Sequence, residues 1–144
     1  MMGDPTVNPR SGVRPILIVD AANVVGSVPD GWWRDRKGAA ERLRDRLAPL
    51  AVSGLGGLPG PIRIVLVVEG RARGVTPVDG VEVVDAPGSG DDAIVDAVRV
   101  NRPDSDTRET PDAPGITVVT ADRELRSRVR ELGALVLGPS TLHG

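Results

Sequence analysis

The feature that most constrains this chain is a short aliphatic run that ends in a carboxylate. Residues 16–19 read Ile-Leu-Ile-Val, and Asp20 follows directly. A continuous apolar run of this length is typical of a strand buried on both faces, as in the centre of a parallel sheet. A carboxylate at the end of such a strand lies where open α/β sheets bind their ligands. Because a buried carboxylate without a partner is costly, Asp20 is predicted to be functional.

Similar aliphatic runs alternate with helical patterns along the rest of the chain. Further strands are predicted at 62–68, 81–85, 116–120 and 134–137. Helices are predicted at 36–48, 91–100 and 122–132, where apolar residues recur at a spacing of three or four. This alternation predicts an α/β fold, a single-domain three-layer α/β/α arrangement around a parallel sheet of about five strands.

The domain is expected to occupy residues 14–140, after a flexible polar N-terminal arm at 1–13. The segment 101–115 is polar with three prolines and is expected to be mobile. The link at 69–80 is short for a helical crossover, which leaves the pairing of the two strands that it joins uncertain.

The composition excludes several kinds of chemistry. The 144 residues include no cysteine, and the only histidine is His143, so thiol catalysis and histidine-based metal sites are not expected. No apolar run approaches the ~20 residues of a membrane span. The N-terminus has no signal-peptide pattern, and a cytoplasmic protein without membrane contact is expected.

Acidic residues follow four of the predicted strands. Glu69 ends the second strand, Asp91 and Asp92 open the helix after the third, and Asp122 opens the helix after the fourth. Parallel strands bring these positions to the same edge as Asp20. Oxygen ligands without histidine or cysteine select hard divalent ions, Mg²⁺ or Mn²⁺, which act on phosphates.

Each of these residues also has a structural interpretation. Asp91, Asp92 and Asp122 stand at predicted helix N-termini, where carboxylates are favourable by roughly 0.3–1 kcal/mol. Glu69 precedes Gly70 and fits the first solvated residue of a turn. Asn23 fits either the cap of a loop or a side chain that orients Asp20 or a water molecule.

Three motifs together resemble the NYN branch of the PIN-like nuclease domains, in particular the YacP-like ribonuclease group. They are Asp20-Ala-Ala-Asn23, Gly88-Ser-Gly-Asp91-Asp92 and Val118-Val-Thr-Ala-Asp122. The resemblance implies a sheet of strand order 3-2-1-4-5 and a divalent-metal-dependent endoribonuclease site.

On that template, Asp20, Asp92 and Asp122 match the metal-binding and catalytic acids, with Asp91 an alternative to Asp92. Asn23, the last residue of the first motif, is expected to be a catalytic residue that positions water or substrate. Glu69 stands where the family usually has aspartate, which puts its role as a metal ligand in doubt. The family pattern DGYN has an aromatic residue that is alanine in this DAAN sequence.

A tryptophan-arginine segment follows the first motif. Trp32 and Trp33 are candidates for stacking on RNA bases, and Arg34 and Arg36 for holding phosphates. In a chain with no other aromatic residue, one of the two tryptophans is expected to pack in the core. Further candidates for phosphate contacts follow later strands, namely Arg71, Arg73 and Arg123.

The sequence therefore predicts an endoribonuclease that uses Mg²⁺ or Mn²⁺ to hydrolyse RNA. The alternatives are a weak or inactive RNA- or ribosome-binding module on the same fold, and a hydrolase of a small phosphate compound. The ribosome, an antitoxin-like protein and a second copy in a homodimer remain candidate partners.

Overall fold

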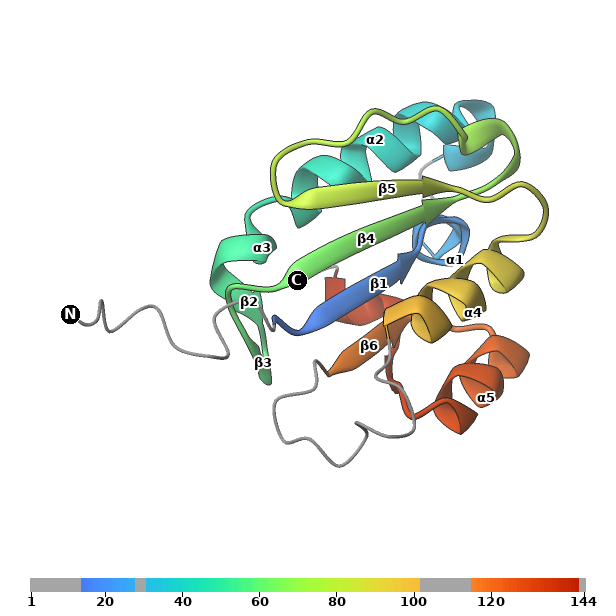
Figure 1. Cartoon of the computed structure of the whole chain (residues 1–144). Helices are drawn as coiled ribbons and strands as arrows, with labels where there is room; N and C mark the ends of the chain where they lie inside the picture. Colours follow the sequence, from blue (N-terminus) through green and yellow to red (C-terminus); the bar gives the residue numbers. More distant parts are fainter. Residues whose placement is uncertain (1–13, 28–30, 102–114, 143–144) are drawn as a thin grey trace.

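A sheet of five parallel strands forms the centre of the computed structural model. The structure describes residues 14–27, 31–101 and 115–142 (Figure 1). The strands are β1 (Ile16–Asp20), β4 (Arg63–Val68), β5 (Val81–Asp85), β6 (Ile116–Val119) and β7 (Leu135–Leu137). They are ordered β5-β4-β1-β6-β7, and every neighbouring pair is parallel. In chain order this is the predicted 3-2-1-4-5 arrangement, which is therefore confirmed.

Helices cover both faces of the sheet. The three longest are α2 (Arg36–Leu47), α4 (Gly90–Asn101) and α5 (Arg123–Glu131), close to the predicted ranges. Shorter elements are α1 (Ala21–Gly26), α3 (Leu50–Ser53) and the 3₁₀ turns η1 (Trp32–Arg34), η2 (Gly70–Ala72) and η3 (Pro139–Leu142).

The central strand β1 has both faces buried, as its aliphatic run predicts. Leu17 and Val19 pack into a core with α1 and α2, whereas Ile16 and Ile18 pack into a second core with α4 and α5. Successive side chains of a strand point to opposite faces, so four consecutive aliphatic residues supply both cores. This packing confirms the single-domain three-layer architecture, with α2 and α4–α5 on opposite sides of the sheet (Figure 1).

Side-chain caps fix where two of the helices begin. The Asp35 carboxylate accepts a hydrogen bond of 2.9 Å from the backbone N–H of Gly38 at the start of α2. The Ser89 hydroxyl accepts one of 3.2 Å from the backbone N–H of Asp92 at the start of α4. Such caps satisfy N–H groups that have no partner within the helix.

Three local features were not predicted or were left open. Residues 21–26 form α1, for which the sequence analysis made no helix prediction. The glycine-rich stretch after α3 contains a small antiparallel hairpin, β2 (Gly54–Leu55) and β3 (Leu58–Pro59). The short link between β4 and β5 contains only η2, which packs on α2, and the two strands are nevertheless parallel.

Two predicted segments fall outside the described residues. They are the N-terminal arm at 1–13 and nearly all of the segment 101–115. Within the part of the chain that the structure describes, no helix has the length and hydrophobicity of a membrane span.

Candidate functional site

Asp20 is the buried centre of the candidate site. It ends β1 and is 5% exposed. Its Oδ2 accepts a hydrogen bond of 2.9 Å from the hydroxyl of Thr120, and its Oδ1 accepts one of 3.3 Å from the backbone N–H of Asn23. Burial raises the pKa of Asp20 from 3.8 to about 6; the two hydrogen bonds lower it, and the nearby charges of Asp91 and Glu69 raise it.

Three further acids lie at the same carboxyl edge of the sheet as Asp20. Glu69 follows β4, and its carboxylate accepts a hydrogen bond from the backbone N–H of Gly90 at the start of α4. Asp122 caps α5 by accepting a bond of 2.8 Å from a backbone N–H. Burial raises the pKa of Asp91, and the charges of Asp122 and Glu69 raise it further. The sheet thus brings four of the predicted acids into one electrostatic group.

The adjacent residues Asp91 and Asp92 occupy different environments. The Asp92 side chain is 73% exposed, and its Oδ1 lies 3.2 Å from an Arg128 guanidinium nitrogen. Asp91, by contrast, is partly buried and is the residue of the two whose charge raises the pKa of Asp20. Of the two residues, Asp91 is therefore the one that interacts electrostatically with Asp20, whereas Asp92 is exposed and pairs with Arg128 of α5.

Thr120 is a site residue that the sequence analysis missed. It is fully buried directly after β6. Its hydroxyl donates to Asp20 and also accepts a hydrogen bond of 3.1 Å from the backbone N–H of Asp122. One side chain therefore connects the ends of β1 and β6, which carry two of the predicted acids. The only sequence signal was its place two residues before Asp122 at the end of an apolar run.

Asn23 joins the same two segments from the other direction. Its side-chain oxygen accepts a hydrogen bond of 3.0 Å from the backbone N–H of Ala121, and its backbone N–H donates to Asp20. The side-chain contact holds α1 against the connection between β6 and α5, whereas the backbone contact is the N-cap that Asp20 provides for α1. A role of the Asn23 side chain in orienting Asp20 or a water molecule stays a prediction.

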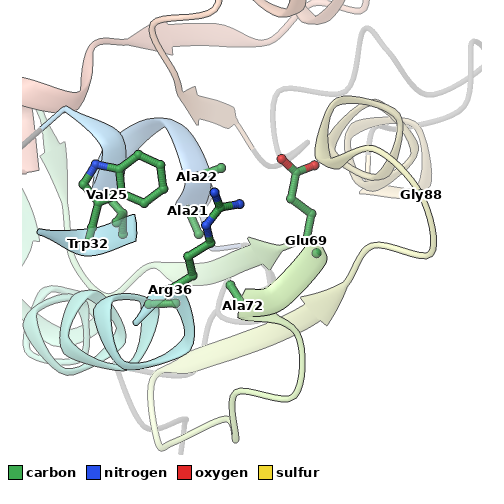
Figure 2. A pocket seen from close by; sticks show the side chains of 10 residues that line it. Ala21, Ala22, Val25, Trp32, Arg36, Glu69, Ala72 and Gly88 are labelled. Atoms are coloured by element: carbon green, nitrogen blue, oxygen red, sulfur yellow. The ribbon is translucent and has the colours of Figure 1, made fainter. Parts of the chain in front are cut away.

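A pocket of about 390 Å³ opens beside this acidic edge. It lies next to the end of β1, because Ala21 is one of its walls, and it contains Glu69 of the acidic group (Figure 2). Most of the lining side chains are small or absent. The lining residues are Ala21, Ala22, Val25, Trp32, Arg36, Ala40, Glu69, Gly70, Ala72 and Gly88.

The two tryptophans divide between the interior and the surface, as predicted. Trp32 is partly buried and packs against the core under α1 and α2, whereas Trp33 is 54% exposed. Their rings are nearly perpendicular, with centroids 6.3 Å apart. The guanidinium carbon of Arg36 lies 5.3 Å from the Trp32 ring centroid, and that of Arg34 lies 5.8 Å from the Trp33 centroid. Each arginine thus stacks on one tryptophan.

The other predicted phosphate contacts are exposed at the same edge. Arg71 lies in η2 after β4, and Arg123 is the first residue of α5 next to Asp122. Arg73 is also exposed and donates a hydrogen bond of 3.3 Å to the backbone carbonyl of Gly70. Their positions bring cationic groups near the acids without placing them inside the acidic group.

The donor chemistry of the acidic group fits Mg²⁺ or Mn²⁺. All the side-chain donors of Asp20, Glu69, Asp91 and Asp122 are carboxylate oxygens, which hard divalent ions prefer. The pKa values of Asp20 and Asp91 are raised mainly by burial and further by the neighbouring carboxylates, and a cation would offset both effects. As they stand, however, the described residues contain no group of three or more His, Cys, Asp or Glu side chains that could hold a metal ion. The metal site therefore remains a prediction.

These features define a three-layer parallel α/β protein with acidic residues and a pocket at the carboxyl edge of its sheet. No protein-family model and no curated protein matches the chain. Among solved structures, the chain is similar to Rae1 (YacP) from Bacillus subtilis, with 21% identity over 89% of this chain and 71% of that one, at a TM-score of 0.65. A mutant of the same protein gives 18% identity, coverages of 90% and 72%, and a TM-score of 0.66. At this identity the similarity establishes a shared fold.

Proposed function

We propose that this chain is a divalent-metal-dependent endoribonuclease whose site is the acidic edge around Asp20. The observation that carries the proposal is the burial of Asp20 at the end of the central strand, within reach of the charges of Asp91 and Glu69. A carboxylate that is buried near other negative charges does not stabilise the folded protein through its own charge, so stability does not explain its presence. Clusters of this kind are characteristic of functional sites.

The proposed roles are as follows. Asp20, Asp91 and Asp122 would hold Mg²⁺ or Mn²⁺, with Glu69 and Asp92 at the periphery. When bound, the ion would activate a water molecule and stabilise the leaving oxygen of a phosphodiester. Arg71 and Arg123 are exposed nearby and would attract the RNA backbone.

The resemblance of the sequence motifs supports RNA as the substrate, and the fold similarity is consistent with it. The three sequence motifs resemble the YacP-like group of PIN-like nucleases, and the fold resembles that of Rae1 (YacP). Ribosome-bound RNA is included in this proposal as a substrate class, whereas an antitoxin-like partner and a homodimer have no support in the observations above.

The test is cleavage of an end-labelled single-stranded RNA with Mn²⁺ or Mg²⁺, with EDTA as the metal-free control. The site variant is Asp20→Asn/Asp122→Asn. A matched control is Asp45→Asn/Asp96→Asn, which removes the same charge from two exposed residues of α2 and α4. Metal-dependent cleavage that only the site variant loses would support the proposal.

Two other outcomes would contradict it. Cleavage that survives in the site variant would place the activity elsewhere or in a contaminant. If the wild type neither cleaves RNA nor binds Mn²⁺ in calorimetry, the chain is not a metal-dependent nuclease. RNA binding by such a protein would favour the alternative, a non-catalytic RNA- or ribosome-binding module.

A further inference from the structure

The pocket beside the acidic edge has a distinct chemical character. Its walls are formed mainly by alanine and glycine residues with one valine, and a single aromatic ring, that of Trp32, lines it. Its volume of about 390 Å³ lies in the range of roughly 300–1,000 Å³ that is usual for small-molecule pockets. Short apolar side chains beside a flat ring leave a space suited to a planar, uncharged group.

The polar groups of the pocket are one cation and one carboxylate. Arg36 lies over Trp32, and Figure 2 shows these two side chains on one side and Glu69 on the other. Nucleobases stack on both aromatic rings and guanidinium planes. Oε2 of Glu69 already accepts the backbone N–H of Gly90, which leaves Oε1 to accept hydrogen bonds from a base edge that carries N–H donors. Among the four RNA bases, guanine presents an imino and an amino N–H side by side on that edge.

The pocket also has the right place relative to the proposed chemistry. Ala21 directly follows Asp20, and Glu69 belongs both to the pocket and to the group of acids that raises the pKa of Asp20. A base in the pocket would therefore hold its own phosphate close to the acidic edge. Trp33, whose ring is exposed, does not line the pocket.

We propose that this pocket binds one unstacked base of the RNA strand, with guanine preferred, next to the bond that is cut. The inference rests on the proposed function for its substrate class. It assigns different roles to the two tryptophans, because Trp32, with Arg36 over its ring, lines the pocket that takes the base, and Trp33 lies outside it. It also gives Ala22 a role, since a larger side chain there would fill the pocket.

The test uses tryptophan fluorescence, because the chain has two tryptophans and no tyrosine or phenylalanine. The probes are the ribodinucleotides GpU, ApU, CpU and UpU, added in EDTA so that no cleavage occurs. Trp33→Leu leaves Trp32 as the only fluorophore, and Trp32→Leu leaves only Trp33. Quenching by GpU is expected in the first variant and not in the second.

Ala22→Leu gives a second test that does not depend on removing a ring from the core. Ala22 is exposed, so the larger side chain is expected to be tolerated in folding, which circular dichroism checks. GpU binding should weaken roughly 5- to 150-fold, the equivalent of one lost base–aromatic stack. Unchanged GpU binding in a folded Ala22→Leu protein would overturn the pocket assignment, and equal binding of all four dinucleotides would overturn the preference for guanine.

The outcomes separate this inference from the proposed function. Quenching at Trp32 in a protein that never cleaves RNA would keep the base pocket and remove the nuclease. RNA cleavage without any quenching at Trp32 would keep the nuclease and remove the pocket. Quenching by guanosine monophosphate but not by GpU would contradict an RNA strand as the ligand and favour a small phosphate compound.

Discussion

In metal-free buffer, Asp20→Asn is expected to stabilise the protein at pH 8 while removing a residue proposed for catalysis. Folding raises the pKa of Asp20 from 3.8 to about 6, mainly because the carboxylate is buried. At about 1.36 kcal/mol per pH unit, this difference corresponds to a penalty of about 3 kcal/mol for the charged form in the folded state. Asparagine carries no charge and avoids that penalty.

The dependence on pH gives the sign of the effect. Below pH 3.8 the carboxyl group is protonated in both folded and unfolded protein, and Asp20 adds no penalty. Between 3.8 and about 6 the unfolded chain ionises first, so the free energy of unfolding falls as the pH rises. The advantage of Asp20→Asn should therefore be small at pH 4, grow through this window and level off above pH 7.

The hydrogen bonds around residue 20 permit the substitution. The asparagine oxygen can accept from the backbone N–H of Asn23, and its amide nitrogen can donate to the Thr120 hydroxyl. Urea unfolding between pH 4 and pH 8, in EDTA, measures the effect. Asp96→Asn is the charge-matched control, because Asp96 is exposed on α4. No gain at pH 8, or the same gain in both variants, would refute the assignment of the penalty to burial of Asp20.

Two further predictions concern the same group. Thr120→Val leaves Oδ2 of Asp20 without its donor and should lower the free energy of unfolding by about 1–3 kcal/mol at pH 8. Thr120→Ser keeps the hydroxyl and should lower it less. Equal losses for the two variants in urea unfolding would mean that the hydrogen bond contributes nothing. Added Mn²⁺ should stabilise the wild type and so raise its melting temperature. At a concentration one hundred times the dissociation constant, the free energy of unfolding should increase by about 2.7 kcal/mol. It should not do so in Asp20→Asn, and an equal rise in both would mean that the ion binds away from Asp20.

The sheet could be predicted because its signal is local. Aliphatic runs such as residues 16–19 are explained only by burial on both faces, and the spacing of apolar residues in α2 and α5 identifies their inner sides. Short elements lack such a pattern. The six residues of α1 complete fewer than two turns, and the two-residue strands β2 and β3 are too short for alternation to show. A Gly56-Gly57 pair between two leucines is, however, a recognised hairpin signal.

The candidate site was predictable to the level of its segments but less so to the level of single side chains. Adjacent positions on a helix point about 100° apart, so a sequence motif that contains both Asp91 and Asp92 does not say which one faces Asp20. Thr120 was missed because a threonine at the end of an apolar run is also an ordinary strand residue. Its role appears only when β6 is paired with β1.

The bond between Thr120 and Asp20 joins residues 100 positions apart, and this has a consequence for biosynthesis. The N-terminal part of a chain emerges first and begins to fold first. β1, β4 and β5 can pair before β6 has been translated, but Asp20 then lacks its hydroxyl donor, and Asp122 does not yet exist. The acidic group is therefore complete only after β6 has been synthesised and inserted beside β1. Under the proposed function, a polypeptide that is still being translated would lack the complete site.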